Sequence, residues 1–200
     1  MDYSQNKEQE TIVSLLTNPE CPVTPNLLDI GAYDGRTFSN SLRLVELGWS
    51  GIMVEPSPNA FIALVNEHKD RPNIKLINAM IGTERSIVKF WNCADAVSTT
   101  EISERDLWAK AGVEFCEIYV PSITIEDIIF QFGSFEFVNI DTEGTSVDIF
   151  KQFPLNVGWP KVFCIEHNQR IVEITDHAKE YGYRMADLNG CNIILEGGHG

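Results

Sequence analysis

Short apolar runs alternate with segments of helical periodicity along most of this chain, and this alternation constrains the fold more than any other feature. Apolar runs bounded by turn residues are typical of buried parallel strands, which need helical crossovers between them. The clearest runs are NLLDI (26–30), GIMVE (51–55), IKLIN (74–78), FEFVNID (135–141) and KVFCIE (161–166). The pattern predicts one α/β domain in three layers, with a mostly parallel sheet between two layers of helices.

Periodicity and capping residues predict the remaining elements. Phe38, Leu42 and Val45 recur at helical spacing after the first strand. Further helices are expected over 4–16, after Ser57-Pro58, and over 103–111, 124–132, 145–153 and 171–181. Further strands are expected over 86–91 and 114–120, with a closing hairpin that turns at Asn189-Gly190 and a loose tail over 197–200.

The sequence is acidic, with a formal net charge of −14 and an isoelectric point near 4.6. An acidic surface repels phosphate backbones, so we expect no nucleic-acid partner. No apolar run reaches the roughly 18 residues of a membrane span, and the polar N-terminus shows no secretory signal. The five cysteines are widely spaced and include no CxxC pair, which indicates neither a disulfide framework nor a zinc site. We therefore expect a cytoplasmic protein with reduced thiols and no membrane partner.

Ligands of parallel α/β sheets bind beyond the carboxyl ends of the strands, so the residues there are candidates for a site. In the loop of LLDIGAYDGRT (27–37), Asp29 precedes Gly31 and Gly35. Glycine adopts positive φ and lets a ligand approach the backbone. The spacing differs from the GxGxxG of dinucleotide-binding proteins. The loop alone fits a ligand cradle and a tight turn equally, and Asp34 fits a ligand contact or a helix cap.

Glu55 ends the second apolar run, and Pro56 follows it. An acid at this place can accept hydrogen bonds from both hydroxyls of a ribose, although a surface glutamate would give the same pattern. Asn78 and Ala79 follow the third run. If Glu55 holds a ribose, an amide and a small side chain would leave room here for a base, whereas a turn asparagine is the structural alternative.

Asp141 and Glu143 follow the fourth run. Carboxylates at the mouth of a cleft bind an amino group, bind a metal or take a proton. His167 follows Glu166 at the end of the fifth run, and histidine is suited to proton transfer near neutral pH. Without HxH or HExxH we predict no metal site, and a hard cation held by Asp141, Glu143 and Glu166 is the alternative.

Taken in order, these motifs resemble those of the FkbM-type family of S-adenosylmethionine-dependent methyltransferases. The family pattern is D-x-G-A-x-x-G, then E-P-x-P, N-A and D-x-E-G. This chain carries DIGAYDG (29–35), EPSP (55–58), NA (78–79) and DTEG (141–144). SITIEDII (122–129) and the closing GYRMADLNGCNIIL (182–195) are also similar, so the resemblance covers about residues 26–195.

The resemblance implies a three-layer, Rossmann-like class I methyltransferase fold with a seven-stranded sheet whose last strand is antiparallel. It implies S-adenosyl-L-methionine as the cofactor, bound by Asp29, Gly31, Ala32, Asp34, Gly35, Glu55, Pro56, Asn78 and Ala79. Asp141, Glu143 and His167 are the predicted catalytic residues. We expect one methyltransferase domain over the whole chain, in which residues 1–25 form an N-terminal helical extension and residues 92–119 a substrate-side insertion.

We predict an O-methyltransferase that acts on a hydroxyl of a sugar or another small metabolite, with a homodimer as the assembly to test. Two alternatives stay open. An NAD-dependent Rossmann oxidoreductase would use Glu55 for the ribose, although the third glycine of GxGxxG is missing. A non-catalytic nucleoside-binding domain would keep the fold without turnover.

Overall fold

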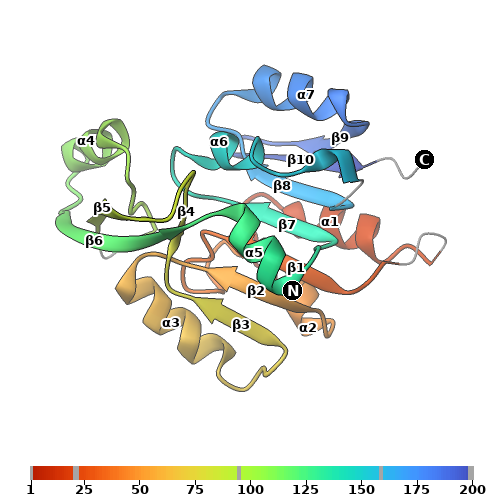
Figure 1. The fold of residues 1–200 in the computed structure, drawn as a ribbon, viewed down its shortest axis with the longest axis horizontal. Helices are drawn as coiled ribbons and strands as arrows, with labels where there is room; N and C mark the ends of the chain where they lie inside the picture. Colours follow the sequence, from red (N-terminus) through yellow and green to blue (C-terminus); the bar gives the residue numbers. More distant parts are fainter. Residues whose placement is uncertain (1, 20–22, 94–95, 158–159, 198–200) are drawn as a thin grey trace.

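A computed structural model describes residues 2–19, 23–93, 96–157 and 160–197 of the chain (Figure 1). Its centre is a seven-stranded sheet in the order β3-β2-β1-β7-β8-β10-β9. Its strands are β1 (Asn26–Ile30), β2 (Ser50–Val54), β3 (Ile74–Ile77), β7 (Phe137–Ile140), β8 (Val162–Glu166), β9 (Tyr183–Leu188) and β10 (Asn192–Gly197). Neighbouring strands run parallel except that β10 is antiparallel to both β8 and β9. The predicted sheet, with its antiparallel last strand, is confirmed.

Helices cover both faces of this sheet. They are α1 (Glu8–Leu16), α2 (Leu42–Glu46), α3 (Pro58–His68), α5 (Ile125–Phe132), α6 (Ser146–Phe150) and α7 (Ile171–Glu180), with a 3₁₀ turn at Leu155–Val157. Side chains of α1, α2 and α3 share one buried core, and those of α5, α6 and α7 share the other. Alternate residues of β1 separate the cores, because Leu27 faces the first whereas Leu28 and Ile30 face the second. The predicted three-layer arrangement is confirmed.

A second, smaller sheet stands beside the large one. It contains β4 (Met80–Ile81), β5 (Ser86–Asn92) and β6 (Cys116–Ile123) in the order β4-β6-β5. This sheet and α4 (Ile102–Lys110) extend to the left of the large sheet in Figure 1. The two long strands and the helix agree with the predicted elements. The sequence did not reveal β4, because it has only two residues and its partner β6 lies far along the chain.

Two helix starts follow the capping rules on which they were predicted. Ser57 caps α3 and Pro58 is its first residue. Thr124 and Asp127 form a capping box at the start of α5, and Gly133, with φ of 84°, ends that helix. These caps fix how the chain leaves β2 and β6, and therefore where the loops at the edge of the sheet lie.

The helix predicted from Phe38 is wrong in its first turn. α2 begins only at Leu42, while Phe38 has φ of 56° and a side chain that is 55% exposed. The Ser39 hydroxyl accepts a hydrogen bond from the Leu42 N–H at 3.0 Å, and such local side-chain bonds compete with a helical turn. The predicted first helix, over 4–16, is also too long, since α1 begins at Glu8. The helix predicted over 145–153 is too long at its other end, since α6 ends at Phe150.

The N-terminal helix is part of the folded body. Ile12 and Leu16 of α1 are buried in the core that α2 and α3 share. At the other end, Gly197 belongs to β10 and not to a loose tail, while residues 198–200 of that predicted tail lie outside the described residues. Among the described helices, none is long and apolar enough to span a bilayer.

Candidate active site

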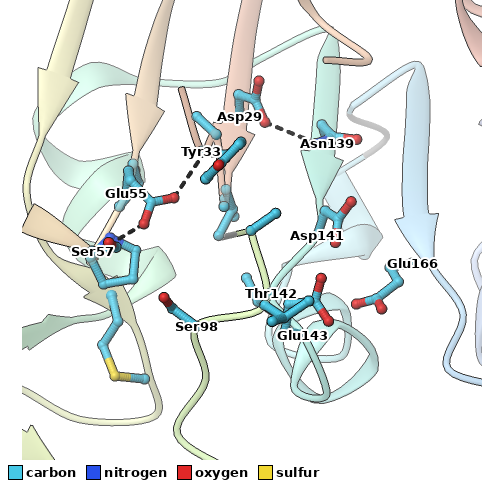
Figure 2. A pocket seen from close by; sticks show the side chains of 18 of the residues that line it. Asp29, Tyr33, Glu55, Ser57, Ser98, Asn139, Asp141, Thr142, Glu143 and Glu166 are labelled. Carbon is cyan, nitrogen blue, oxygen red and sulfur yellow. Dashed lines mark hydrogen bonds between the residues drawn. The ribbon is translucent and has the colours of Figure 1, made fainter. Parts of the chain in front are cut away.

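A cavity of about 520 Å³ lies at the carboxyl ends of the central strands. Loops after β1, β2 and β7 form its walls, together with β4 and the segment between β5 and β6, which contributes Ser98, Trp108 and Val113. The predicted site residues that line it are Asp29, Gly31, Ala32, Glu55, Pro56, Ala79, Asp141 and Glu143. Those that do not are Asp34, Gly35, Asn78 and His167. Figure 2 shows Glu55 and Glu166 on opposite sides of this cavity.

Gly31 is required by a close approach of two loops. Its φ is +82°, and a Cβ added to it would lie 1.6 Å from the carbonyl oxygen of Asp141. Gly35 serves a different purpose, because its added Cβ would lie 2.6 Å from side-chain atoms of Leu64 and His68 on α3. The first glycine therefore shapes the cavity, whereas the second lets the loop pack on α3.

Asp34 stabilises its own loop through local hydrogen bonds. Its carboxylate accepts hydrogen bonds from the N–H groups of Arg36 and Thr37 at 2.8 and 2.7 Å, and from the Thr37 hydroxyl at 2.7 Å. Of the two interpretations of Asp34, the geometry favours the cap over a ligand contact.

Asp29 anchors a buried polar chain beneath the cavity. The Ser41 hydroxyl donates to one carboxylate oxygen, and the Asn139 amide donates to the other at 2.8 Å. Asn40 donates to the Asn139 carbonyl oxygen at 3.0 Å. Burial raises the pKa of Asp29. Asp29 therefore holds the wall of the cavity together, and its two oxygens are already engaged inside the protein.

Glu55 is buried and aimed across the glycine loop (Figure 2). Its two oxygens accept hydrogen bonds from the N–H groups of Tyr33 at 2.9 Å and Ser57 at 2.7 Å. Tyr33 has φ of 51°, which turns its N–H towards this carboxylate. Each carboxylate oxygen has a second lone pair, so Glu55 can still accept two hydroxyl groups. Burial raises its pKa to about 7.

Ala79 lines the cavity, while Asn78 supports it from outside. The Asn78 amide donates to the carbonyl oxygens of Glu55 and Pro56, at 2.8 and 3.2 Å. Asn78 therefore fixes the loop after β2 to the end of β3. Met80 and Phe90 of the small sheet also line the cavity and give this end an apolar character that suits an aromatic base.

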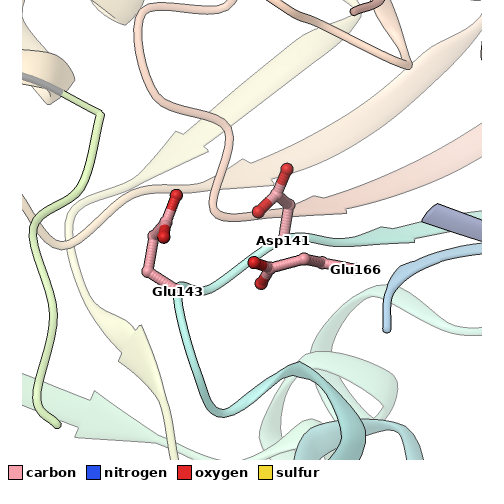
Figure 3. A group of neighbouring side chains, drawn as sticks. All are labelled: Asp141, Glu143 and Glu166. Carbon is pink, nitrogen blue, oxygen red and sulfur yellow. The ribbon is translucent and has the colours of Figure 1, made fainter. Parts of the chain in front are cut away.

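Three carboxylates gather at the ends of β7 and β8. One oxygen of each of Asp141, Glu143 and Glu166 lies within 4.8 Å of the others, and Figure 3 shows the groups turned towards a common space. Glu166 also accepts hydrogen bonds from Ser146 at 3.0 Å and Asn168 at 2.8 Å. Carboxylates at this spacing can share a proton, bind a cationic group or hold a hard metal ion.

Asp141 and Glu166 hold their protons more tightly than exposed acids do. Burial is the main cause that raises the pKa of Asp141 well above its ordinary value, and the charges of Glu166 and Glu143 add to it. Burial likewise raises the pKa of Glu166, although its hydrogen bonds from Ser146 and Asn168 act in the opposite direction. A raised pKa makes these carboxylates stronger bases than free aspartate or glutamate.

The segment between β5 and β6 contacts the loop that carries Glu143. The Thr99 hydroxyl donates to the carbonyl oxygen of Glu143 at 2.8 Å. A Cβ added to Gly144 would lie 3.1 Å from Glu101 and 3.2 Å from Glu104. The glycine of the D-x-E-G motif therefore leaves room for the start of α4 against the loop after β7.

His167 is not part of this group. Its Nδ1 accepts the Gln169 N–H at 3.0 Å, so its proton resides on Nε2, which lies 3.2 Å from the carbonyl oxygen of Asn189. Both ring nitrogens are thus occupied by backbone groups, and the ring ties the turn of the closing hairpin to β8. The geometry favours a structural role for His167 over that of a general base.

The sequence reasoning missed several residues that the structure brings to the site. Tyr33 contributes through its backbone, which leaves no sequence signal. Asn139 did have a sequence signal, because it is a polar residue inside the apolar run FEFVNID. It lies two positions before Asp141 and therefore faces the same side of the strand as Asp141. Asn40 and Gln5 also line the cavity, and neither belongs to a motif.

Comparison with known proteins assigns the fold and the family. The domain described as the methyltransferase FkbM domain matches residues 29–185. The chain belongs to the FkbM methyltransferase family. At the level of sequence, none of the curated proteins matches this FkbM-family chain.

Solved structures share the fold of this FkbM-family chain at low identity. Methyltransferase FkbM from Methylobacillus flagellatus is 18% identical with a TM-score of 0.54, over 86% of this chain and 43% of that one. A precorrin-6y C5,15-methyltransferase from Geobacter metallireducens is 10% identical with a TM-score of 0.53, over 98% and 89%. A ribosomal protein L11 methylase from Lactobacillus delbrueckii is 12% identical with a TM-score of 0.51, over 96% and 77%. This chain thus spans less than half of the M. flagellatus protein.

Family membership implies S-adenosylmethionine as the methyl donor, and the residues present fit it. The cavity has the size of a small-molecule site, whose usual volume is roughly 300 to 1,000 Å³. Glu55 keeps free lone pairs for the two hydroxyls of a ribose. The apolar end at Ala79, Met80 and Phe90 suits an adenine ring.

Proposed function

We propose that the chain is an S-adenosylmethionine-dependent O-methyltransferase that acts on a hydroxyl of a sugar or another small metabolite. One observation carries the proposal: a single cavity holds a buried carboxylate at the end of β2 and three clustered carboxylates at the ends of β7 and β8. Glu55 would hold the ribose of the cofactor. Asp141, Glu143 and Glu166 would lie on the side of the acceptor.

When bound, S-adenosylmethionine supplies a methyl group that its positive sulfur already activates. The residues of the chain then have to orient the acceptor and take the proton of its hydroxyl, because a neutral hydroxyl is a weak nucleophile. Asp141 is our candidate for this base. Its carboxylate lines the cavity, and burial with two acidic neighbours raises its pKa. The same negative cluster favours a cationic sulfonium nearby.

The lining of the cavity favours an uncharged acceptor over an anionic one. Among the described residues that line it, none is lysine, arginine or histidine. A phosphate or carboxylate on the acceptor would therefore lack a cationic partner and would meet the acidic cluster. Threonine side chains provide hydroxyl groups on the wall of the cavity, and Trp108 provides an aromatic surface. Both kinds of group suit a neutral polyol.

Calorimetry tests the cofactor directly. We expect S-adenosylmethionine and its demethylated product S-adenosylhomocysteine to bind with a Kd on the order of micromolar. NAD serves as the comparison, since a dinucleotide would also place a ribose at Glu55. Binding of NAD without binding of S-adenosylhomocysteine would refute the proposal and support the oxidoreductase alternative. Turnover is then sought by supplying neutral sugars and detecting S-adenosylhomocysteine as a product.

A further inference from the structure

Two of the clustered carboxylates, Glu166 and Asp141, differ in the hydrogen bonds that they accept. Glu166 accepts from the Ser146 hydroxyl at 3.0 Å, from the Asn168 amide at 2.8 Å and from the backbone N–H of Glu143. The carboxylate of Asp141 accepts no hydrogen bond from the residues that the structure describes. Donors stabilise the charged form of a carboxylate. When the two groups share one proton, Glu166 is therefore the member that stays charged, and the proton lies on Asp141.

The surroundings of Ser146 fix the direction in which its hydroxyl donates. Ser146 is fully buried, and its oxygen accepts the N–H of Thr142 at 3.0 Å. The Thr142 hydroxyl lies 3.1 Å from the same oxygen, and it accepts the hydroxyl of Thr145 at 2.9 Å. A serine hydroxyl has a single hydrogen, which these neighbours leave directed at Glu166. The fold itself therefore stabilises the charge on Glu166.

The pair lies in acidic surroundings. Burial is the main cause that raises the pKa of Asp141, and the charges that add to it are those of acids: Glu166 on β8, Glu143 in the loop after β7, Asp29 on β1 and Glu8 on α1. After burial, the charge of Glu104 on α4 acts on Glu166 in the same direction. Among the described residues that line the cavity, none carries a positive charge. Carboxylates within 4.8 Å of one another resist ionising together in such a place, so a proton stays in the cluster.

A ligand can supply the positive charge that this cluster lacks. S-adenosylmethionine has a positive sulfur, whereas the sulfur of S-adenosylhomocysteine is neutral. A sphere of 520 Å³ is about 10 Å across, so a ligand in this cavity holds its charge within about that distance of the cluster. At about 10 Å and an effective dielectric constant of about 20, the attraction lowers the pKa of a carboxyl by roughly 1.

We propose that Asp141 holds a proton in the cofactor-free enzyme and releases it when S-adenosylmethionine binds, so that the base forms only in the loaded site. This inference rests on the proposed function, in which Asp141 takes the proton of the acceptor hydroxyl. Without the cofactor, Asp141 is already protonated and cannot accept a second proton from the acceptor. The charge of the cofactor therefore does two things, because it activates the methyl group and it frees the base.

The proton balance of a turnover follows from this assignment. Binding of the cofactor sends the proton of Asp141 to solvent. In the methyl transfer, an electron pair of the acceptor oxygen forms the new C–O bond, the C–S bond breaks with its electrons left on sulfur, and the hydroxyl proton passes to Asp141. The sulfur is then neutral, so Asp141 keeps this proton until the next S-adenosylmethionine binds. Each turnover releases one proton in total.

Calorimetry with the two ligands measures the released proton without any acceptor. The heat of binding is determined between about pH 6 and pH 9, in two buffers of different ionisation enthalpy at each pH, and the difference gives the protons released. A chelator keeps divalent cations out of the cluster. Both ligands would place a ribose at Glu55, so a proton lost from Glu55 is common to them and cancels. The proteins are wild type, Asp141→Asn, Glu166→Gln and the control Glu126→Gln, at an exposed position of α5.

We expect wild type to release about 0.5 proton more with S-adenosylmethionine than with S-adenosylhomocysteine at the pH where the difference is largest. Relative to Asp141→Asn, its preference for S-adenosylmethionine should rise about tenfold as the pH passes through this range, because deprotonation then no longer opposes binding. Asp141→Asn should lose the extra release. The ionisation of the ligands themselves is the same with both proteins, so it cancels. Glu166→Gln removes a neighbouring charge and should move the largest release to lower pH, while Glu126→Gln should behave as wild type.

Three outcomes would overturn the inference. The same difference between the two ligands in wild type and in Asp141→Asn would show that Asp141 releases no proton. Extra release that disappears only in Glu166→Gln would place the proton on Glu166. If Asp141→Asn does not fold, Glu166→Gln decides, since a largest release at the same pH as in wild type contradicts a proton shared by the pair. A wild type that binds neither ligand would instead refute the proposed function, and the inference with it.

Discussion

Replacing Glu55 by glutamine should separate the role of this side chain in stability from its role in binding. Burial raises the pKa of Glu55 from 4.5 to about 7. Because the pKa is higher in the folded state, the folded protein holds a proton that the unfolded chain loses between these two pH values. The stability that Glu55 contributes is therefore fully present below pH 4.5 and is lost as the pH rises through about 7.

The magnitude follows from the two pKa values. Their difference corresponds to about 3 kcal/mol of unfolding free energy, most of which is lost between pH 5 and pH 8. Glutamine does not ionise, so the Glu55→Gln variant should not lose this unfolding free energy as the pH rises. We expect the unfolding free energy of Glu55→Gln, relative to wild type, to rise by about 2 to 3 kcal/mol from pH 5 to pH 8. The glutamine amide nitrogen cannot accept a hydrogen bond from a backbone N–H group, as a carboxylate oxygen of Glu55 does. The resulting loss of stability is the same at both pH values, so it cancels when the two pH values are compared.

Urea unfolding without cofactor, at pH 5 and pH 8, measures this change. The matched control is Glu126→Gln, at an exposed position of α5. In parallel, Glu55→Gln should weaken S-adenosylhomocysteine at pH 8 about tenfold or more, because an ionised acceptor of the ribose hydroxyls is lost. If the difference in unfolding free energy between Glu55→Gln and wild type is the same at both pH values, burial does not raise the pKa of Glu55. Unchanged affinity would refute its contact with the ribose.

Three further substitutions test the rest of the site. Asp141→Asn should lower kcat about 100-fold or more and leave the Kd of S-adenosylhomocysteine within about threefold, and an unchanged kcat would remove Asp141 as the base. Gly31→Ala should cost about 3 kcal/mol or more in urea unfolding, because the added Cβ would lie 1.6 Å from a carbonyl oxygen. Stability equal to that of wild type would show that the two loops do not meet this closely. His167→Gln should lower stability by about 1 to 3 kcal/mol without moving the pH–rate profile, whereas loss of an ionisation from that profile would restore His167 as a base.

The strand ends could be predicted from the sequence because each shows a buried apolar strand followed at once by a residue that ends it. An apolar run that stops at an acid or a glycine marks both where the strand is covered and where it reaches solvent. Gly31, Glu55 and Asp141 were found in this way, and all three line one cavity. Helix caps were equally readable, since the capping box at Thr124 depends on residues three positions apart.

Features that depend on distant partners could not be predicted. Asp29 and Asn139 meet across 110 positions of the sequence, and only the parallel register of β1 and β7 brings them together. Phe38 matched a helical spacing, but its local backbone turns into the left-handed region beside the cavity. His167 carried the signal expected of a general base, yet backbone groups of Gln169 and of Asn189 in the hairpin turn occupy its two nitrogens.

The small sheet has a consequence for how acceptor preference can change among relatives. Met80 and Ile81 of β4 pair with Ser122 and Ile123 of β6, so the segment between them enters and leaves the domain side by side. Residues 82–121 form a cassette on a fixed base, and they supply the Trp108 and Val113 wall of the cavity. Exchanging this cassette would alter the wall at Trp108 and Val113 and also Phe90 at the apolar end, while the glycine loop and Glu55 stay in place. In the function we propose, one continuous stretch of the gene therefore encodes much of the wall that would face the acceptor.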